Sequence, residues 1–474
     1  MKKLISIILI AAAAVSVLVM PVSANAAAKQ KVYKSGSFKY VTSAKAAKIV
    51  KYVGKGGKVT IPSKLGGKTV IGVAHDSFKN SKITSVKFPN TVTAIGNTAF
   101  DSCYSLRSVK LSNRLQSIGE HAFWACNELK SIKLPDSVKK IGRGLFLDCD
   151  VLKSVTLSKN ITQIPDFCFS HTSIKSLTLP ADCKKIGTHA FEESKLETLT
   201  LGKNFKTFSE EAFYFVSYLK KIKVSKNNPY YCSKDGVLYN KKMTELVLYP
   251  WANKAKEFTV PSTVKSIGDE AFHNSGWGVT YLKKINLPKG LKRIGDYAFT
   301  CMEKLREAKI PSKVEYIGIK AFYETSLSEV KIPKSVKYIS DKAFSYTKAE
   351  TIDVDPNPEL ELGEKVFAGC HKLTKVTLFP VKDSDGYTFH YCGRLEEVEI
   401  PDTITTIYEY DFYDCNFTEI TIPDTVKKIE TGAFGYEYID PEGTYEIEDF
   451  TIRGSKGSAA EKYAKENGFT FEEI

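Results

Sequence analysis

The chain has 474 residues and a formal net charge of +14 at pH 7, and a length of this size ordinarily divides into two or three globular domains. A basic surface favours anionic partners such as wall polymers, acidic glycans, membrane headgroups or nucleic acid, although solvated lysines would also keep a long protein in solution. Beyond residue 26, no stretch approaches the roughly 18 apolar residues that a membrane span needs, which excludes a membrane-spanning body.

Residues 1–26 have the features of a secretory signal peptide. Two lysines precede an apolar run over residues 4–20, and the small-residue pattern Ala24-Asn25-Ala26 follows as a cleavage site. An uncleaved membrane anchor is the alternative, but a cleavage site directly after the run favours removal. The mature chain is therefore predicted to be exported, with a net charge of +12, and export argues against nucleic acid as a partner.

Residues 27–58 are predicted to form an N-terminal β cap. Two apolar segments, Phe38–Val41 and Ile49–Val53, have strand character and flank a turn. They are expected to cover the first coil of the repeat array that begins at residue 59, because an uncapped end would expose core and unpaired strand edges.

A unit of 22 or 23 residues repeats over residues 59–224 and 258–454. Each unit closes on a phenylalanine, and every interval between these phenylalanines is 22 or 23 residues except the two that end at Phe272 and Phe299. A fixed period of this size predicts a solenoid of about 15 coils, in which stacked units make the core. The closing residues are Phe78, Phe100, Phe123, Phe146, Phe169, Phe191, Phe213, Phe272, Phe299, Phe322, Phe344, Phe367, Phe389, Phe412 and Phe434.

Each part of the unit has a physical reason. Ile132 and Leu134 alternate with polar residues, which indicates a half-buried strand, and Pro135 ends it because proline cannot donate to a strand ladder. Ile141 belongs to a second apolar pair from the opposite wall of the coil, and Gly142 marks a tight bend. The stacked phenylalanines are predicted to form a spine.

The unit L-x-x-I-x-L-P, V-x-x-I-G, A-F-x-x-C resembles the BspA-like, or Treponema pallidum type, leucine-rich repeat across residues 59–454. The resemblance implies a curved, right-handed leucine-rich-repeat solenoid, mainly β, with a parallel sheet on the concave side. It also implies a bacterial secreted or surface protein, since some members are associated with adhesion to host matrix or other cells. It does not imply one ligand, and the chain shows neither an LPxTG-like sorting motif nor a lipoprotein cysteine.

Six of the ten cysteines form a column of the repeat. The same position holds serine or threonine in other units, which indicates a packing role. The packing role favours reduced, buried thiols. Disulfides are the alternative, because stacked neighbours would lie roughly 5 Å apart, within disulfide reach. No C-x-x-C pair exists, which argues against zinc. The column comprises Cys103, Cys126, Cys149, Cys370, Cys392 and Cys415.

Residues 225–257 interrupt the array as a β-hairpin insert. Val237–Tyr239 and Leu246–Tyr249 are predicted to be its strands. The sequence NPYY…DGVLYNK…TELVLYP resembles an insert common in this repeat family. Residues 455–474 are predicted to form a C-terminal cap, with a helix over Ala459–Asn467 that stops at Gly468.

Side chains that flank the central residue of each strand are expected to line the concave face. In the first half these are serine, threonine and lysine without an acid, whereas the last third is mostly glutamate. This predicts a groove for an extended anionic or sugar-bearing partner, and the alternative is ordinary solvated surface, which suits the same residues. The candidate ligand-binding lysines are Lys87, Lys110, Lys133, Lys221 and Lys223.

Aromatic residues at the insert and near residue 277 are the second candidate site, because exposed rings anchor carbohydrate and protein interfaces. The alternative is that they pack the insert onto its neighbouring coils, since a two-stranded hairpin alone is marginally stable. The candidates are Tyr230, Tyr231, Trp251 and Trp277, of which the two tryptophans are expected to stay partly exposed.

Catalysis finds little support in the sequence. No G-x-S-x-G, H-E-x-x-H or phosphate-binding glycine loop occurs, and the seven histidines are spread at most one to a coil. We therefore expect no enzyme activity, cofactor or metal site. The leading hypothesis is a secreted or surface scaffold that binds an extracellular protein or glycan, such as host matrix. The alternative is a structural protein held on an anionic wall polymer by positive charge.

Overall fold

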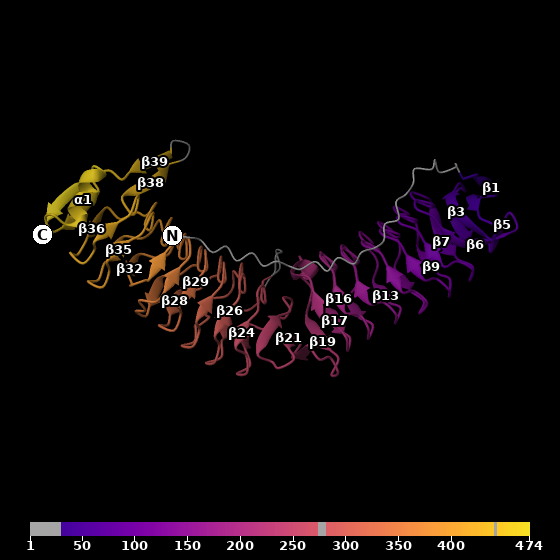
Figure 1. Cartoon of the computed structure of the whole chain (residues 1–474), viewed down its shortest axis with the longest axis horizontal. Coiled ribbons are helices and arrows are strands. Elements are labelled where there is room, and N and C mark those ends of the chain that lie inside the picture. Colours follow the sequence, from indigo (N-terminus) through magenta and orange to yellow (C-terminus); the bar gives the residue numbers. More distant parts are fainter. Residues whose placement is uncertain (1–29, 274–280, 440–442) are drawn as a thin grey trace.

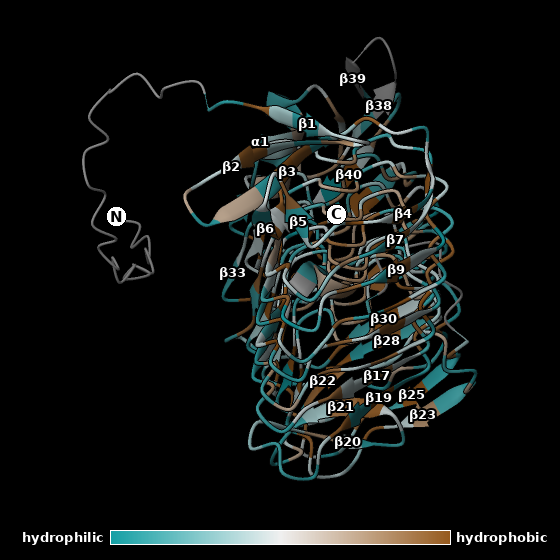
Figure 2. Cartoon of the chain, turned by 90° about the vertical axis from the view of Figure 1, so that its right-hand side faces the viewer, coloured by the Kyte–Doolittle hydropathy of each residue, from teal (hydrophilic) through white to brown (hydrophobic). Residues whose placement is uncertain are grey.

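The computed structural model describes residues 30–273, 281–439 and 443–474, and it is a curved solenoid of about 18 turns with a cap at each end (Figure 1). Most turns carry one longer strand of three to five residues and one two-residue strand. Seen along the solenoid, the longer strands lie on one side and the short strands on the other (Figure 2). The N-terminal signal peptide predicted for residues 1–26 lies outside the described residues.

The longer strands pair in parallel in groups of two or three, and we call the outer surface of all of them the long-strand face. They are β4 (Gly57–Thr60), β7 (Ile83–Lys87), β9 (Ser108–Lys110), β11 (Ser131–Lys133), β13 (Ser154–Thr156), β15 (Ser176–Thr178), β17 (Thr198–Leu201), β19 (Lys221–Val224), β23 (Glu257–Thr259), β25 (Lys284–Asn286), β28 (Glu329–Ile332), β30 (Thr351–Val354), β32 (Lys375–Thr377), β34 (Glu397–Glu399), β36 (Glu419–Thr421) and β40 (Thr451–Gly454).

The short strands build the opposite wall, as the second apolar pair of the repeat predicts. They are β6 (Lys68–Val73), β8 (Ala94–Ile95), β10 (Ser117–Ile118), β12 (Lys140–Ile141), β14 (Gln163–Ile164), β16 (Lys185–Ile186), β18 (Thr207–Phe208), β24 (Ser266–Ile267), β26 (Arg293–Ile294), β27 (Tyr316–Ile317), β29 (Tyr338–Ile339), β31 (Glu361–Leu362), β33 (Asp383–Ser384), β35 (Thr406–Ile407) and β37 (Lys428–Ile429).

The two ends are closed by additional elements. At the N-terminus, β1 (Tyr33–Ser35), β2 (Phe38–Thr42) and β3 (Ala46–Tyr52) form an antiparallel meander, and β3 continues in parallel into β6, beside which lies β5 (Lys64–Leu65). At the C-terminus, the hairpin β38 (Tyr436–Ile439) and β39 (Gly443–Glu446) precedes α1 (Ala459–Glu466) and β41 (Thr470–Glu473). Gly468 adopts a positive φ of 75° after α1, where the sequence predicts the helix stop.

The phenylalanine spine is present and buried. Rings of consecutive coils stack with centroids 4.8 to 6.0 Å apart within residues 78–213, and Phe146 is fully buried. The expectation of about 15 coils was too low, because tyrosine closes coils that a search for phenylalanine misses. Tyr52 stacks on Phe78, and Tyr249 stacks on Phe272. The Tyr249 amide also donates to the next coil as the repeat phenylalanines do.

The cysteine column packs inside the solenoid. All six of its members are buried, and most of their thiols donate to the carbonyl of a repeat phenylalanine one coil earlier, as Cys149 Sγ does to Phe123 O at 3.0 Å. Burial raises the pKa of Cys103 to about 11 and of Cys415 to about 12. The ten cysteines are free thiols in the structure. The column therefore has the packing role that its exchange with serine and threonine predicts.

The insert is continuous with the array. Three antiparallel strands, β20 (Tyr231–Lys234), β21 (Val237–Asn240) and β22 (Glu245–Leu248), form a meander, and β22 then pairs in parallel with β24. The sequence indicated two strands, and β20 is the third. A short 3-10 turn, η1 (Glu210–Phe213), lies just before the insert. The buried apolar residues divide here into two clusters, one running from the N-terminal cap and the other toward the C-terminus.

Candidate functional site

The first half of the long-strand face carries a lysine column beside a hydroxyl column. Lys87 and Lys110 are direct partners across β7 and β9, and Thr60 lies opposite Lys87 on β4. Lys133 occupies the same place on β11 and faces Thr156 on β13. All three lysines are exposed, and within the described residues none takes part in an ion pair. Like charges directly opposite each other repel, so this column would gain from an anionic ligand.

The column ends, toward the insert, with two further predicted lysines. Lys221 and Lys223 on β19 lie opposite Thr198 and Thr200 on β17 in parallel register, and both are exposed. Between these two groups of lysines the face is serine and threonine. Along this surface, a section with lysines is therefore followed by a section of serine and threonine and then by Lys221 and Lys223, in the order that the sequence indicates.

The second half of the same face is internally neutralised. Lys284 contacts Glu307 at 2.8 Å, Lys331 contacts Asp353 at 2.7 Å, and Lys375 contacts Glu397 at 2.7 Å. Hydrogen bonding to these carboxylates raises the pKa of each lysine. Each pair joins neighbouring coils, so the charges there cancel within the protein. Lys309, two residues after Glu307, is the exception in this half, since it is exposed and no ion pair reaches it within the described residues. The unpaired lysines of the long-strand face are therefore concentrated in its first half.

The predicted aromatic cluster at the insert mostly packs inward. Tyr230 is 45% exposed, with the Lys206 ammonium 5.9 Å from its ring centre. Tyr231 is partly buried, and its hydroxyl donates to the Lys206 carbonyl at 3.1 Å, while burial raises its pKa. Only the first of these two rings can act as an exposed anchor.

Trp251 is only 5% exposed, so the expectation that it stays partly exposed was wrong. The cause is the way the chain returns from the insert, which packs the indole against the first hydrophobic cluster. Its Nε1 is buried and has no hydrogen-bond partner among the described residues. Trp277 lies outside the described residues.

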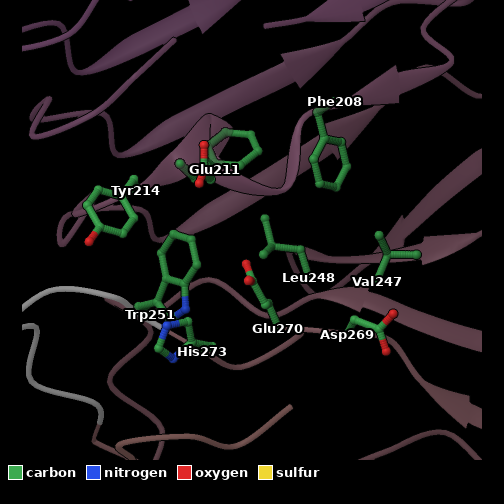
Figure 3. Close-up of a pocket in the computed structure, with 10 residues that line it drawn as sticks. Phe208, Glu211, Tyr214, Val247, Leu248, Trp251, Asp269, Glu270 and His273 are labelled. Carbon is green, nitrogen blue, oxygen red and sulfur yellow. The ribbon is translucent and has the colours of Figure 1, made fainter. Parts of the chain in front are cut away.

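Trp251 lines a cavity of about 140 Å³ that the sequence did not reveal (Figure 3). Apolar side chains form part of its wall, and three carboxylates and an imidazole form the rest. Trp251 and His273 both line the cavity (Figure 3). The lining residues are Phe208, Glu211, Phe213, Tyr214, Val247, Leu248, Trp251, Asp269, Glu270 and His273.

Two polar groups of this cavity, Asp269 and His273, are shaped by their surroundings. Asp269 accepts a hydrogen bond from Arg293 at 2.9 Å, and burial lowers the pKa of His273. The cavity lies where the phenylalanine spine is interrupted, since Phe213 borders one side and Trp251 another. No sequence signal could have located it, because it arises from the junction of two stacks and not from a motif.

Among the described residues, no three histidine, cysteine, aspartate or glutamate side chains come together in a metal-binding group. The histidines lie on separate coils, and His75 and His171 contact carboxylates beside them. The longest helix in this part of the chain, α1, has eight residues, and none is long and apolar enough to cross a bilayer.

The repeat geometry agrees with a known family. A model described as the BspA type leucine rich repeat region matches residues 72–197, 152–250, 248–374 and 318–440. The chain belongs to the BspA-type leucine-rich repeat family. The resemblance predicted from the L-x-x-I-x-L-P and A-F-x-x-C unit is thereby confirmed. No curated protein matches this BspA-type chain.

Three solved structures show what this BspA-type protein is similar to. A leucine rich cell surface protein from Faecalibacterium prausnitzii A2-165 has 27% identity and a TM-score of 0.57, covering 79% of this chain and 96% of its own. The pneumococcal vaccine antigen PcpA has 22% identity and a TM-score of 0.49, covering 94% and 98%. The T. pallidum leucine rich repeat protein has 31% identity and a TM-score of 0.35, covering 38% and 86%. The similarity to the first structure supports the leucine-rich-repeat fold.

Proposed function

We propose that this protein is a non-catalytic binding scaffold of the bacterial cell surface, which uses the first half of its long-strand face to hold an extracellular protein or glycan with anionic groups. The observation that carries the proposal is the difference between the two halves. Lys87 and Lys110 are unpaired and directly opposed, whereas Lys331 and Lys375 are neutralised by partners one coil away.

The chemistry of this half suits an extended ligand. Lysine supplies mobile point charges for carboxylate, sulfate or phosphate groups. The hydroxyl column beside it, as at Ser85 and Ser108, can donate to and accept from sugar hydroxyls. Because both columns run from coil to coil, a ligand that crosses the strands would meet the same pair of groups repeatedly. An adhesin-like role at a host matrix or cell surface fits such a surface.

The experiment is binding of the chain from residue 27 onward to immobilised matrix proteins and acidic glycans at 0.15 M salt. Exchanging Lys87, Lys110 and Lys133 together for glutamate should weaken binding by at least about tenfold, with the melting temperature nearly unchanged. The matched control reverses three exposed lysines elsewhere, Lys139, Lys140 and Lys185, with the same change in net charge. Equal binding by both triple variants would contradict a role for the face.

A second candidate is retention on an anionic wall polymer by charge alone. It is favoured by the net charge of +14, and it differs from the first in its salt dependence. Binding to purified cell wall that is lost at 1 M salt, where the screening length is about 3 Å, would support retention. Saturable binding of matrix or glycan that persists at 1 M salt would support the scaffold.

A further inference from the structure

The N-terminal cap is built almost without negative charge. Between residue 30 and residue 75 the chain contains ten lysines and no aspartate or glutamate, and the first acid is Asp76. The structure describes every residue of this segment. The lysines are Lys31, Lys34, Lys39, Lys45, Lys48, Lys51, Lys55, Lys58, Lys64 and Lys68.

Three of these lysines lie in register across the antiparallel meander. Lys34 on β1 is the direct partner of Lys39 on β2, and Lys39 is the direct partner of Lys51 on β3. Directly opposed residues of an antiparallel pair project to the same side, with Cβ atoms about 5 Å apart. All three side chains are exposed. We call Lys34, Lys39 and Lys51 the cap lysine row.

The row is electrostatically uncompensated. Within the described residues no ion pair reaches any of its members, whereas Lys79, in the first coil, is paired with Asp101 at 2.8 Å. Like charges placed directly opposite each other destabilise a sheet. The cap thus keeps an unfavourable arrangement that a ligand with closely spaced negative charges would relieve.

We propose that the cap lysine row binds a linear polyanion with closely spaced phosphate groups, which crosses β1, β2 and β3 at right angles to the strands. Consecutive negative groups of such a chain would meet consecutive ammonium groups. This site is separate from the long-strand face, since β1 to β3 continue the short-strand wall through β6 and β8. The proposal therefore goes beyond the scaffold function and does not depend on it.

The observations favour a polymer over an anionic membrane. The exposed apolar side chains of the cap are Val32, Tyr33, Val53 and Ile71, of which only the first two are adjacent in the sequence. Tyr33 stacks on Tyr40 with ring centroids 5.6 Å apart, so its ring is engaged within the cap. A surface that inserts into lipid needs a contiguous apolar face, which these separated residues do not supply.

The observed ion pairs also favour a polymer over the acidic C-terminal end of a second copy of the chain. Glu472 contacts Arg453 at 2.7 Å, Glu466 contacts Lys462 at 3.8 Å, and Glu430 contacts Lys428 at 2.5 Å. Acids at that end are therefore partly satisfied by their own neighbours. A free polyanion offers negative groups without such competition.

The test uses inorganic polyphosphate as the probe and the chain from residue 27 onward. We expect binding at 0.05 M salt that weakens steeply with added salt. The variant Lys39→Glu places a carboxylate between two lysines and should weaken binding by about tenfold or more, with a salt slope shallower by about one for each contact removed. The control Lys289→Glu makes the same charge change at an exposed turn and should lose less than about threefold.

Stability separates loss of binding from loss of fold. Because the introduced carboxylate would have a cationic partner on each side, Lys39→Glu should melt at the same temperature as the natural chain or higher. Lys34→Glu and Lys51→Glu serve as second variants with the same expectation. Three results would overturn the proposal: equal losses in Lys39→Glu and Lys289→Glu, binding to phosphatidylglycerol vesicles without binding to polyphosphate, or salt-sensitive self-association in place of polyphosphate binding. If polyphosphate binding is lost in Lys39→Glu while matrix or glycan binding is kept, both proposals stand.

Discussion

At the scale of single residues, the phenylalanine that closes each unit has the clearest role. It recurs at a fixed interval, and in the structure a ring such as Phe146 stacks on those of the coils before and after it. When such a ring is removed, rearrangement of its own coil alone cannot fill the space between the two neighbouring rings. The stacked rings therefore connect each coil to its neighbours, and removing one ring should destabilise that coil and the two beside it.

Replacing Phe146 by alanine should lower the free energy of unfolding by roughly 3 to 5 kcal/mol, because the ring is fully buried and its removal leaves a cavity. Denaturant titration followed by circular dichroism would measure the loss. Tyr104, which is 59% exposed in a nearby turn, is the control, and its exchange for alanine should have a small effect. A loss below about 1 kcal/mol for Phe146→Ala would argue against the spine.

Two partly buried histidines predict how stability depends on pH. Burial lowers the pKa of His273 and of His390 below the ordinary value of 6.5. The unfolded chain then takes up protons at a higher pH than the folded chain, so their contribution is complete above about pH 6.5 and is lost as the pH falls toward the folded pKa values.

The urea midpoint should therefore fall between pH 7 and pH 5, and the double exchange His273→Gln and His390→Gln should make this fall shallower. An unchanged pH dependence in the double variant would contradict the assignment.

At the scale of elements, the bend after a short strand is closely packed where glycine occupies it. A Cβ atom at Gly142 would overlap the backbone nitrogen of Glu120 in the preceding coil, and Gly119 has the same relation to Asn97. The glycine of the V-x-x-I-G pattern is thus required by the spacing between coils and not by a positive φ.

Gly142→Ala should destabilise the protein by about 1 kcal/mol or more, because the neighbouring coil would have to move. Gly393→Ala is a matched control, since a Cβ atom there meets nothing within 4 Å. Thermal melting of the two variants would show the difference. If both variants melt alike, the coils can shift without penalty and the bend has another cause.

At the scale of the whole molecule, the insert divides the core. The first hydrophobic cluster ends at the insert with Trp251, and the second begins there with Val237 and Tyr239. In a repeat protein each unit contacts only its neighbours, so stability is a sum of local terms and cooperativity can fail at a weak junction. A cavity lies at this junction, beside Phe213, the last repeat phenylalanine before the insert.

We expect equilibrium unfolding in two transitions, one for the coils before the insert and one for those after it. Phe146→Ala should lower only one midpoint, and Phe344→Ala, in the second cluster, should lower only the other. Hydrogen exchange followed by mass spectrometry would assign the transitions to residues. A single transition shifted equally by both variants would show that the junction is as strong as the other interfaces.

The sequence by itself determined the repeat, its strands and the lysine and hydroxyl columns, because a period of 22 or 23 residues places equivalent residues above one another whatever the details of the coil. It also located the insert, though not its third strand β20. It could not show that tyrosine replaces phenylalanine in the spine at Tyr52 and Tyr249, since neither lies at the end of an A-F step.

Only the tertiary structure decided which charges remain unpaired and which rings remain exposed. Ion pairs such as Lys331 with Asp353 join residues one coil apart, and Trp251 is buried by packing against another part of the chain. The lysine row of the cap depends on a bulge that brings Lys51 opposite Lys39. Such features follow from distances between coils and strands, and the order of residues along one strand does not contain them.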